Sequence, residues 1–400
     1  MTSSLQVSAV LALRALQRGN KFTLGLTILI MGLVFVLMVF QPSILTGYVK
    51  SFDNQIIDYS YGNIVLEPKQ YQSYIKDVKN LTEKVDRVPG VVSSMAEYNA
   101  AGTFTYQGTS LGSTLTSVTP SDDVQVLKTS SKIISGDFLS DGDRDQIVIG
   151  SLLAGHKDTT LDKVKSLGGV EVGDSVDVTF SNGVTRKYHV KGIFETKVTS
   201  IDQSALITNN EMESVNGLSD KASLVVIRLS SSGNENEFRN TLMQFGIQEQ
   251  IKTWVEAGAG FVSDINTTFS LINSIMIVFS LVIGGIVIFI VIFINTVNKR
   301  KQIAIMKAIG IKKEIIINNY LIQAGILCLA GIILGLVMFD IIVYFLTLYP
   351  LQFPNGPVPP VVDPIWSADS IIALVIVSLI AGYIPAWKTA REEILEAMRG

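Results

Sequence analysis

Residues 22–40, FTLGLTILIMGLVFVLMVF, form an unbroken apolar run without a single charged residue. A helix needs about 20 mostly apolar residues to cross the hydrocarbon core of a bilayer. The run is too long for the apolar core of a secretory signal peptide, and Gln41-Pro42 follows it in place of a small-residue cleavage site. It therefore predicts an uncleaved membrane anchor.

Three further runs of this kind lie in the second half of the chain, at about 269–294, 320–348 and 371–387. The chain as a whole is 48% hydrophobic and only 17% charged, whereas soluble proteins carry about 25% charged residues. We therefore predict an α-helical membrane protein with four transmembrane helices, one before and three after a large domain outside the membrane.

The orientation follows from the lysines and arginines that flank the runs, because such residues concentrate on the cytoplasmic side. They cluster before the first run, between the second and third, and after the fourth: Arg14, Arg18 and Lys21; Lys299, Arg300, Lys301, Lys307, Lys312 and Lys313; Lys388, Arg391 and Arg399. The connection 349–370 has no lysine or arginine, and residues 42–265 hold 28 acidic and 20 basic residues. Both termini are thus expected in the cytoplasm and 42–265 outside it, with no basic surface for nucleic acid.

The large domain is expected to be mixed α/β. A strand at 63–67, a helix at 71–88 and a strand from Val91 are followed much later by a second strand–helix–strand pattern at 223–229, 235–245 and 247–254. These halves are expected to form one split α/β unit. Residues 101–221 between them read as a β-rich insertion, with short strands at 146–149, 175–180, 187–194 and 205–208 and a hairpin turn at Ser181-Asn182-Gly183.

Motifs for catalysis or nucleotide binding are missing from the sequence. It contains no P-loop, and its two histidines, His156 and His189, have no metal-ligand spacing. Asp141, Asp143 and Asp145 begin like a calcium loop, but the glycine and the final acid of that motif are replaced by Gln146 and Leu152, which favours a solvated turn. We expect no catalytic residues, no bound metal and no cofactor in this chain.

Small residues within the apolar runs predict close helix packing. Gly25 and Gly32 lie seven apart in the first run, and Gly331 and Gly335 lie four apart in the third. Packing within the chain and contact with another subunit are equally compatible with this spacing. Asp340, near the outer end of the third run, is interpreted as an interfacial carboxylate.

The cytoplasmic segment 298–317, NKRKQIAIMKAIGIKKEIII, is the most informative connection. Ile305, Met306 and Ile309 are expected on one helical face, Lys301 and Lys307 lie beyond it, and Gly310 ends the helix. Such a helix could lie on anionic lipid. It could equally transmit force from a cytoplasmic protein, and the residues alone do not separate these alternatives.

The chain resembles the FtsX/MacB-like permeases of ABC transporters, which include the lipoprotein-release subunits LolC and LolE. Residues 301–310, KQIAIMKAIG, are similar to the family's REIGILKAIG segment, and 385–391, PAWKTAR, with 394–399, ILEAMR, are similar to its C-terminal tail. Further similar stretches are LALRAL at 11–16, GDFL at 136–139, IVIG at 147–150 and VGDSV at 172–176. Three positions depart from the family pattern: Gln302 replaces a Glu, Ala304 a Gly and Ile394 a Pro. The first departure puts in doubt a salt bridge from this position to an ATPase.

The resemblance implies a permease subunit that works by mechanotransmission. A separate cytoplasmic ATPase would carry the P-loop, bind ATP and magnesium, and contact the coupling segment through Lys301, Gln302, Ile305, Met306, Lys307 and Gly310. A second permease copy or a paralogue would complete a dimer, lipid would surround it, and an adaptor outside the membrane is a possible further partner. The outer domain would be a porter-like α/β unit with a β-rich insertion, acting on a lipophilic or amphipathic substrate such as a lipoprotein, peptide or drug.

This reading divides the chain into nine parts: an amphipathic N-terminal helix 1–21, first span 22–41, outer domain 42–265 with its insertion at about 101–221, second span 269–297, coupling segment 298–317, third span 318–348, outer loop 349–369, fourth span 370–387 and cytoplasmic tail 388–400. The main alternative is an ATPase-independent sensor or scaffold that binds a ligand outside the membrane. A membrane-bound hydrolase is disfavoured, because the sequence offers no set of nucleophile, base and acid.

Overall fold

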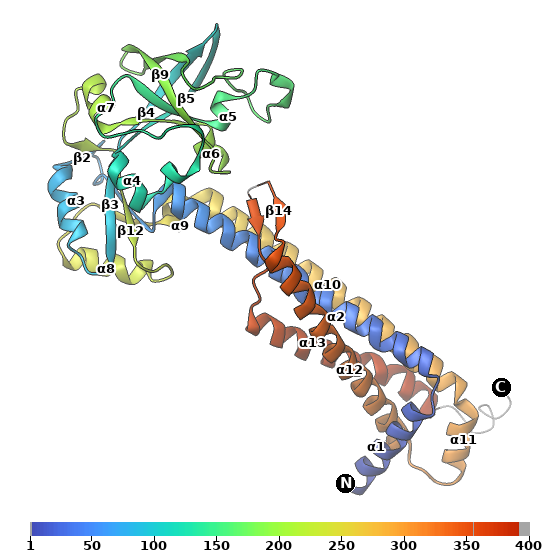
Figure 1. The fold of residues 1–400 in the computed structure, drawn as a ribbon. Helices are drawn as coiled ribbons and strands as arrows, with labels where there is room; N and C mark the ends of the chain where they lie inside the picture. The colour runs from blue at the N-terminus through green and yellow to red at the C-terminus, as the bar shows by residue number, and fades with distance from the viewer. Residues whose placement is uncertain (1, 355, 392–400) are drawn as a thin grey trace. The chain divides into compact units, whose positions relative to one another are not determined.

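The computed structural model describes residues 2–354 and 356–391. The chain divides into two compact units, one made of residues 1–49, 266–353 and 357–400 and the other of residues 50–265 and 354–356. Figure 1 shows their elements. We call them the helical unit and the outer unit.

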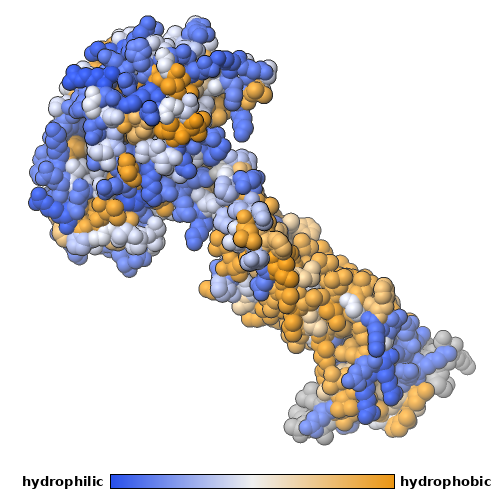
Figure 2. All heavy atoms as spheres, viewed as in Figure 1, coloured by the Kyte–Doolittle hydropathy of each residue, from blue (hydrophilic) through white to orange (hydrophobic). Residues whose placement is uncertain are grey.

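Within the described residues, the helical unit contains four helices that are long and apolar enough to cross a membrane. They lie in α2 (Lys21–Ile56), α10 (Ala259–Asn298), α12 (Lys313–Leu348) and α13 (Pro364–Arg391). Two shorter helices, α1 (Thr2–Gln17) and α11 (Arg300–Ala308), and the strands β14 (Leu351–Phe353) and β15 (Gly356–Val358) complete the elements of this part of the chain. Hydrophobic residues cover the visible surface of the long helices (Figure 2), as expected for surfaces that face lipid.

Helix α2 is longer than the apolar run that predicts it. The sequence predicts an end near Gln41, since Pro42 follows, but the helix continues through Pro42 to Ile56. Proline removes one backbone donor within a helix, and here the next residue, Ser43, donates its hydroxyl to the Val39 carbonyl at 2.8 Å. The helix is thus interrupted by one missing hydrogen bond without ending.

The core of the helical unit brings the long helices together. Met31 and Phe35 of α2, Ile292 of α10, Cys328 of α12 and Leu374 of α13 belong to one buried cluster. Residues 392–400, which include Arg399 and most of the predicted tail 388–400, lie outside the described residues.

The outer unit contains the split α/β arrangement that the sequence predicts. Its four-stranded sheet has the order β13 (Gln250–Thr253), β1 (Ile64–Glu67), β12 (Leu224–Leu229), β3 (Val91–Glu97), and each neighbouring pair is antiparallel. The helices α3 (Val78–Asp86) and α8 (Glu235–Gln244) supply Val85 and Leu242 to the core on one face of this sheet. Two strand–helix–strand halves from distant parts of the sequence therefore interleave in one sheet.

The helix predicted at 71–88 is wrong in its first half. Residues 75–76 form β2 (Ile75–Lys76), which pairs with β11 (Lys221–Ala222), and α3 begins only at Val78. Tyr71 and Asp77 have φ of 68° and 55°, values that an α-helix does not contain. The apolar spacing of Tyr74 and Val78 favoured a helix. In the structure Tyr74 lies just before β2, and Val78 is the first residue of α3.

The β-rich insertion folds as a seven-stranded sheet of order β6-β9-β7-β10-β5-β4-β8, in which β8 also pairs with β9 and so closes the sheet. Its strands are β4 (Asn99–Tyr106), β5 (Thr109–Val118), β6 (Ile133–Gly136), β7 (Gln146–Gly150), β8 (Ser175–Phe180), β9 (Thr185–Phe194) and β10 (Ala205–Thr208). The predicted hairpin turn joins β8 to β9, where Thr179 faces Thr185 and Gly183 has φ of 83°. The hairpin of β4 and β5, turning at Gln107-Gly108 with positive φ at both residues, is an addition to the predicted strands.

The two sheets share a buried layer. Met95 and Val226 of the small sheet lie in one cluster with Val148 and Leu206 of the large sheet and with Val126. Val126 is the last residue of α4 (Pro120–Val126). The remaining short helices of this unit are η1 (Ile57–Tyr61), η2 (Thr129–Lys132), α5 (Ser151–Ala154), η3 (Thr159–Leu161), α6 (Thr199–Asp202), α7 (Asn209–Asn216) and α9 (Trp254–Ala257). The shared core makes one folded unit of both parts.

Candidate functional site

The coupling segment forms the short helix α11, held between two long apolar helices. Lys299, with φ of −103° and ψ of 12°, separates it from α10, and only residues 309–312 separate it from α12. With such short connections at both ends, α11 has little freedom to move independently of α10 and α12.

Ile303 and Ala304 form the buried face of α11. Ile303 is 2% exposed and Ala304 is fully buried, whereas Ile305 and Ile309 are 52% and 76% exposed. Of the three residues expected on one helical face, Ile305 and Ile309 are exposed and Met306 alone packs against the buried core. Ile303 and Ala304, which anchor α11 in the core, were not predicted as site residues. Two adjacent apolar residues have no helical periodicity that would indicate a buried face.

Gly310 ends α11 in a Schellman motif. The N–H of Gly310 donates to the carbonyl of Lys307 at 3.0 Å, and the N–H of Ile311 donates to the carbonyl of Met306 at 3.0 Å. Gly310 has φ of 90°, which residues with a side chain rarely adopt, and both Met306 and Ile311 pack against the core. This motif fixes the direction in which the chain leaves α11.

We expect Gly310→Ala to loosen this end of α11. The space beside Gly310 is open, with no atom within 4 Å of an added Cβ, so the cost is the backbone strain alone, about 1 kcal/mol. Hydrogen exchange of residues 307–311 should become about five-fold faster or more. Unchanged exchange of residues 307–311 in Gly310→Ala would contradict the assignment.

The exposed surface of α11 combines charge with apolar side chains. Lys301, Gln302, Ile305 and Ile309 are all exposed, while Lys307 is half-buried. In Figure 2 hydrophilic residues gather at the end of the helical unit where Figure 1 places α1 and α11. Two exposed isoleucines beside lysines offer a small contact area, either for a protein or for a lipid surface.

Helix α1 packs on the start of α12. Its residues Ser8 and Ala12 are buried, and the Ser8 hydroxyl donates to the Ile315 carbonyl at 3.2 Å. Val7, Val10 and Leu13 are about half exposed, so the other side of α1 is apolar as well. The helix is therefore anchored by its small residues, and its larger apolar side chains remain available to lipid.

Three of the four glycines singled out in the sequence lie together between α2 and α12. A Cβ added to Gly331 would lie 2.4 Å from the Met31 Cβ, and one added to Gly335 would lie 2.8 Å from the Gly32 carbonyl oxygen. Gly25, in contrast, has no atom within 4 Å of an added Cβ. The structure thus brings Gly32, Gly331 and Gly335 into one intrachain helix contact and leaves Gly25 apart.

The other polar candidates have local partners. His156 contacts Asp162 at 2.8 Å, and His189 contacts Ser175 at 3.0 Å. Asp143 accepts the N–H of Ser140 and pairs with Lys191, and Asp141 accepts the N–H of Ser121. These two carboxylates thus tie their loop to the segments that contain Ser121 and Lys191.

Two candidates belong to the long helices. Asp340 is exposed on α12, about two turns before the helix ends at Leu348. Cys328 is buried in the core and accepts a hydrogen bond from the Ser378 hydroxyl at 3.3 Å, which links α12 to α13.

Residues 274–394, which begin in α10 and include α11, α12 and α13, match the family model of the FtsX-like permease C-terminal domain. The C-terminal region of the chain is an FtsX-like permease domain. Helix α11 lies inside this FtsX-like domain, between two of its apolar helices. The resemblance to FtsX/MacB-like ABC permeases predicted from the sequence is thereby confirmed.

Curated relatives extend this result. The chain is 28% identical over 154 residues to the macrolide export ATP-binding/permease protein MacB of Mannheimia succiniciproducens, an alignment that covers 38% of the chain and 22% of the relative. It is 25% identical over 135 residues to the probable syringafactin export ATP-binding/permease protein SyfD of Pseudomonas syringae pv. tomato, covering 33% of the chain and 19% of the relative. The chain thus spans about a fifth of the length of these relatives.

Among solved structures, the extracellular domain of the noncanonic ABC-type transporter YknZ from Gram-positive bacteria aligns with 48% of the chain and 97% of its own length, at 15% identity and a TM-score of 0.34. The periplasmic region of MacB from Actinobacillus actinomycetemcomitans aligns with 49% of the chain and 89% of its own length, at 11% identity and a TM-score of 0.35.

Proposed function

We propose that this chain is the membrane subunit of an ATP-driven transporter and that a separate ATPase binds the exposed surface of α11. Binding and hydrolysis of ATP by that partner would move α11 and, with it, α10 and α12. The outer unit would then rearrange and export or release a lipophilic or amphipathic substrate. The observation that carries the proposal is α11 itself, anchored by Ile303 and Ala304 while Ile305 and Ile309 remain exposed beside Lys301.

Two further facts support an ATPase that acts with this permease. No P-loop occurs in the 400 residues, and relatives that align with part of the chain are named ATP-binding/permease proteins. ATP and magnesium would be bound by the partner, with no cofactor held by this chain. Lys301 and Gln302 would make the polar contacts at the edge of the interface, and Ile305 and Ile309 its apolar centre.

The proposal includes a topology and an assembly. The four long apolar helices among the described residues support a multi-pass membrane protein, and the flanking lysines and arginines favour cytoplasmic termini with α11 on the same side. A second copy or a paralogue would form the dimer in the cytoplasmic membrane, and an adaptor outside the membrane is a further proposed partner. The substrates in the relatives' names, macrolides and syringafactin, belong to those proteins. By analogy, these names support a lipophilic or amphipathic substrate for this chain.

Purification of the tagged chain from its native host in mild detergent, followed by mass spectrometry, tests the proposal. We expect a P-loop ATPase in stoichiometric amount, and a more than ten-fold loss of it in Ile309→Asp, because a carboxylate would be desolvated at the centre of the interface. Ile134→Asp, which changes an exposed isoleucine of β6 in the outer unit, is the matched control and should retain the ATPase. If no ATPase accompanies the wild type even after mild cross-linking, a sensor or scaffold becomes the better assignment.

A further inference from the structure

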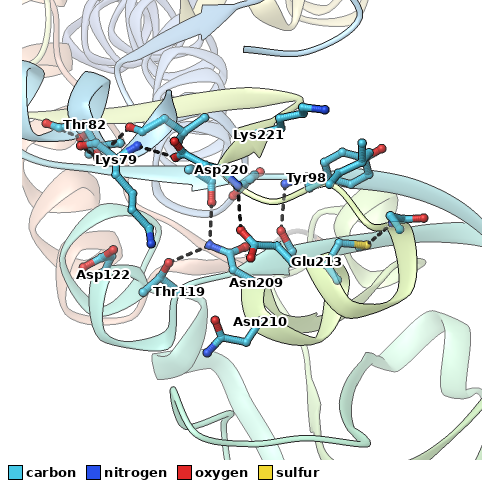
Figure 3. A pocket seen from close by; sticks show the side chains of 18 of the residues that line it. Lys79, Thr82, Tyr98, Thr119, Asp122, Asn209, Asn210, Glu213, Asp220 and Lys221 are labelled. Carbon is cyan, nitrogen blue, oxygen red and sulfur yellow. Dashed lines mark hydrogen bonds between the residues drawn. The ribbon is translucent and has the colours of Figure 1, made fainter. Parts of the chain in front are cut away.

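A cavity of about 300 Å³ lies within the outer unit, where the split α/β part meets the β-rich part. Residues of α3, β3, α4 and α7 line it (Figure 3). The sequence alone does not predict this cavity, because its walls come from segments more than a hundred residues apart.

The charged residues that line the cavity are mainly acidic. Five carboxylates and two lysines contribute: Asp86, Glu97, Asp122, Glu213 and Asp220, with Lys79 and Lys221. Three of the carboxylates are held by hydrogen bonds. Asp220 accepts the N–H of Lys79 at 3.0 Å, Glu213 accepts the N–H of Asp220 at 3.1 Å, and Asp86 accepts the hydroxyl of Ser94 at 2.8 Å.

Glu97 is the exception among these acids. It lies at the end of β3, is only 6% exposed, and its carboxyl group has no hydrogen-bond partner among the described residues. Burial, with a smaller contribution from the negative charge of Asp123, raises the pKa of Glu97 to about 8. Glu97 is largely desolvated and faces the cavity, so a ligand group that supplied a charge-assisted hydrogen bond there would be favoured.

The geometry favours an organic cation over a metal ion. Across the described part of the chain, no three histidine, cysteine, aspartate or glutamate side chains converge to hold a metal. The acids instead surround a space that accommodates several carbon atoms, and Val78, Tyr98, Met212 and Leu218 supply apolar wall. Tyr98 stacks on Tyr74 with ring centroids 5.4 Å apart, which holds an aromatic ring at the cavity where it can also contact a cation.

We propose that this cavity binds a small organic cation whose ammonium group pairs with the Glu97 carboxylate. This inference does not rest on the proposed function, because it requires only the outer unit and holds equally for a transporter or a sensor. The two lysines that line the cavity, Lys79 and Lys221, act against binding because their charge repels a cation. Lys79 is exposed, and its ammonium group competes with the ligand for the acids of the cavity.

Binding is then linked to proton release. Glu97 is mostly protonated at pH 6, and an ammonium group stabilises its ionised form, so the affinity should rise between pH 6 and pH 9 as the proton is lost more easily. The charged groups that share its surroundings are Asp122 and Asp123 of α4, Lys79 and Asp86 of α3, Glu213 of α7, and Asp220 and Lys221 at β11. Burial also raises the pKa of Asp122 and of Asp123.

Isothermal titration of the full chain in detergent tests this inference with three amines, cadaverine, agmatine and spermidine, and with the uncharged 1,5-pentanediol as a matched probe. We expect at least one amine to bind the wild type with a Kd of about 1 mM or tighter at pH 8, and the diol not to bind. The heat should depend on the ionisation enthalpy of the buffer, which reports a released proton.

Glu97→Gln should weaken amine binding at least ten-fold, and Lys79→Gln should strengthen it. Glu237→Gln, at an exposed acid on α8, is the control and should change nothing. The melting temperature of each variant shows whether it is folded, and glutamine is nearly isosteric with the protonated glutamic acid. Absence of binding by all three amines, or equal affinities for wild type and Glu97→Gln, would overturn the proposal.

Discussion

Replacing Gly331 with leucine is expected to prevent the helical unit from assembling. An added Cβ would lie 2.4 Å from the Met31 Cβ and 3.3 Å from the Gly32 nitrogen. Both atoms are fixed by the backbone of α2, so neither can rotate away. Overpacking of this kind costs about 3 kcal/mol or more, and apolar packing is a main source of helix association in lipid. The measurement is the yield of monodisperse protein in detergent, which we expect to fall by more than ten-fold.

Gly25→Leu is the matched control. It introduces the same side chain on α2, the helix that Gly331 contacts through Met31 and Gly32. No atom lies within 4 Å of an added Cβ at Gly25, so the yield and the melting temperature should be close to those of the wild type. Equal losses in both variants would mean that Gly25 packs against another molecule and that the intrachain contact does not explain the glycine spacing.

Replacing Asp58 with alanine is expected to destabilise the outer unit by about 3 kcal/mol. Arg228, only 9% exposed, donates from Nη2 to the Asp58 carboxylate at 2.7 Å and from Nε to the Val126 carbonyl at 2.9 Å. Without Asp58 a buried guanidinium would lose its counter-charge, which is the costly way to break such a pair. Hydrogen exchange of β12 in the full chain should become faster by two orders of magnitude, the equivalent of about 3 kcal/mol.

The control is Lys128→Gln, which removes the second cation near the same carboxylate. Lys128 lies 3.5 Å from Asp58, and its side chain is 49% exposed, so this exposed pair contributes less than about 1 kcal/mol. If Lys128→Gln and Asp58→Ala accelerate exchange equally, the burial of Arg228 is not the reason for the stability of this contact.

The elements that the sequence predicts well are those with a strong, uniform pattern. The four long helices come from uncharged apolar runs, and β1, β12 and β13 come from short β-branched stretches flanked by turns. The joining of the two strand–helix–strand halves in one α/β unit could be predicted because both halves have the same order of elements, whereas the interleaved strand order is seen only in the structure. The longer extent of α2 could not, because Pro42 reads as a stop and the sequence beyond it is polar.

The parts that resisted prediction depend on contacts between distant residues. The face that α11 buries is chosen by the core of the long helices, which receives Ile303 and not Ile305. Asp77 has a positive φ of 55°. Helix propensities do not predict this conformation for a residue within an apparently helical pattern. Glu97 reads as an ordinary polar residue at the end of a strand, and only the packing of α4 and α7 around β3 buries its carboxyl group.

A photo-reactive amino acid placed at position 309 in living cells shows whether a protein partner occupies the exposed surface of α11. Ile309 is 76% exposed, so the probe can be accommodated without disturbing the core. We predict a single major adduct with a P-loop ATPase, and no such adduct from a probe at position 134 in the outer unit. Adducts with lipid alone from position 309, under conditions in which the chain is folded and in the membrane, would contradict the claim.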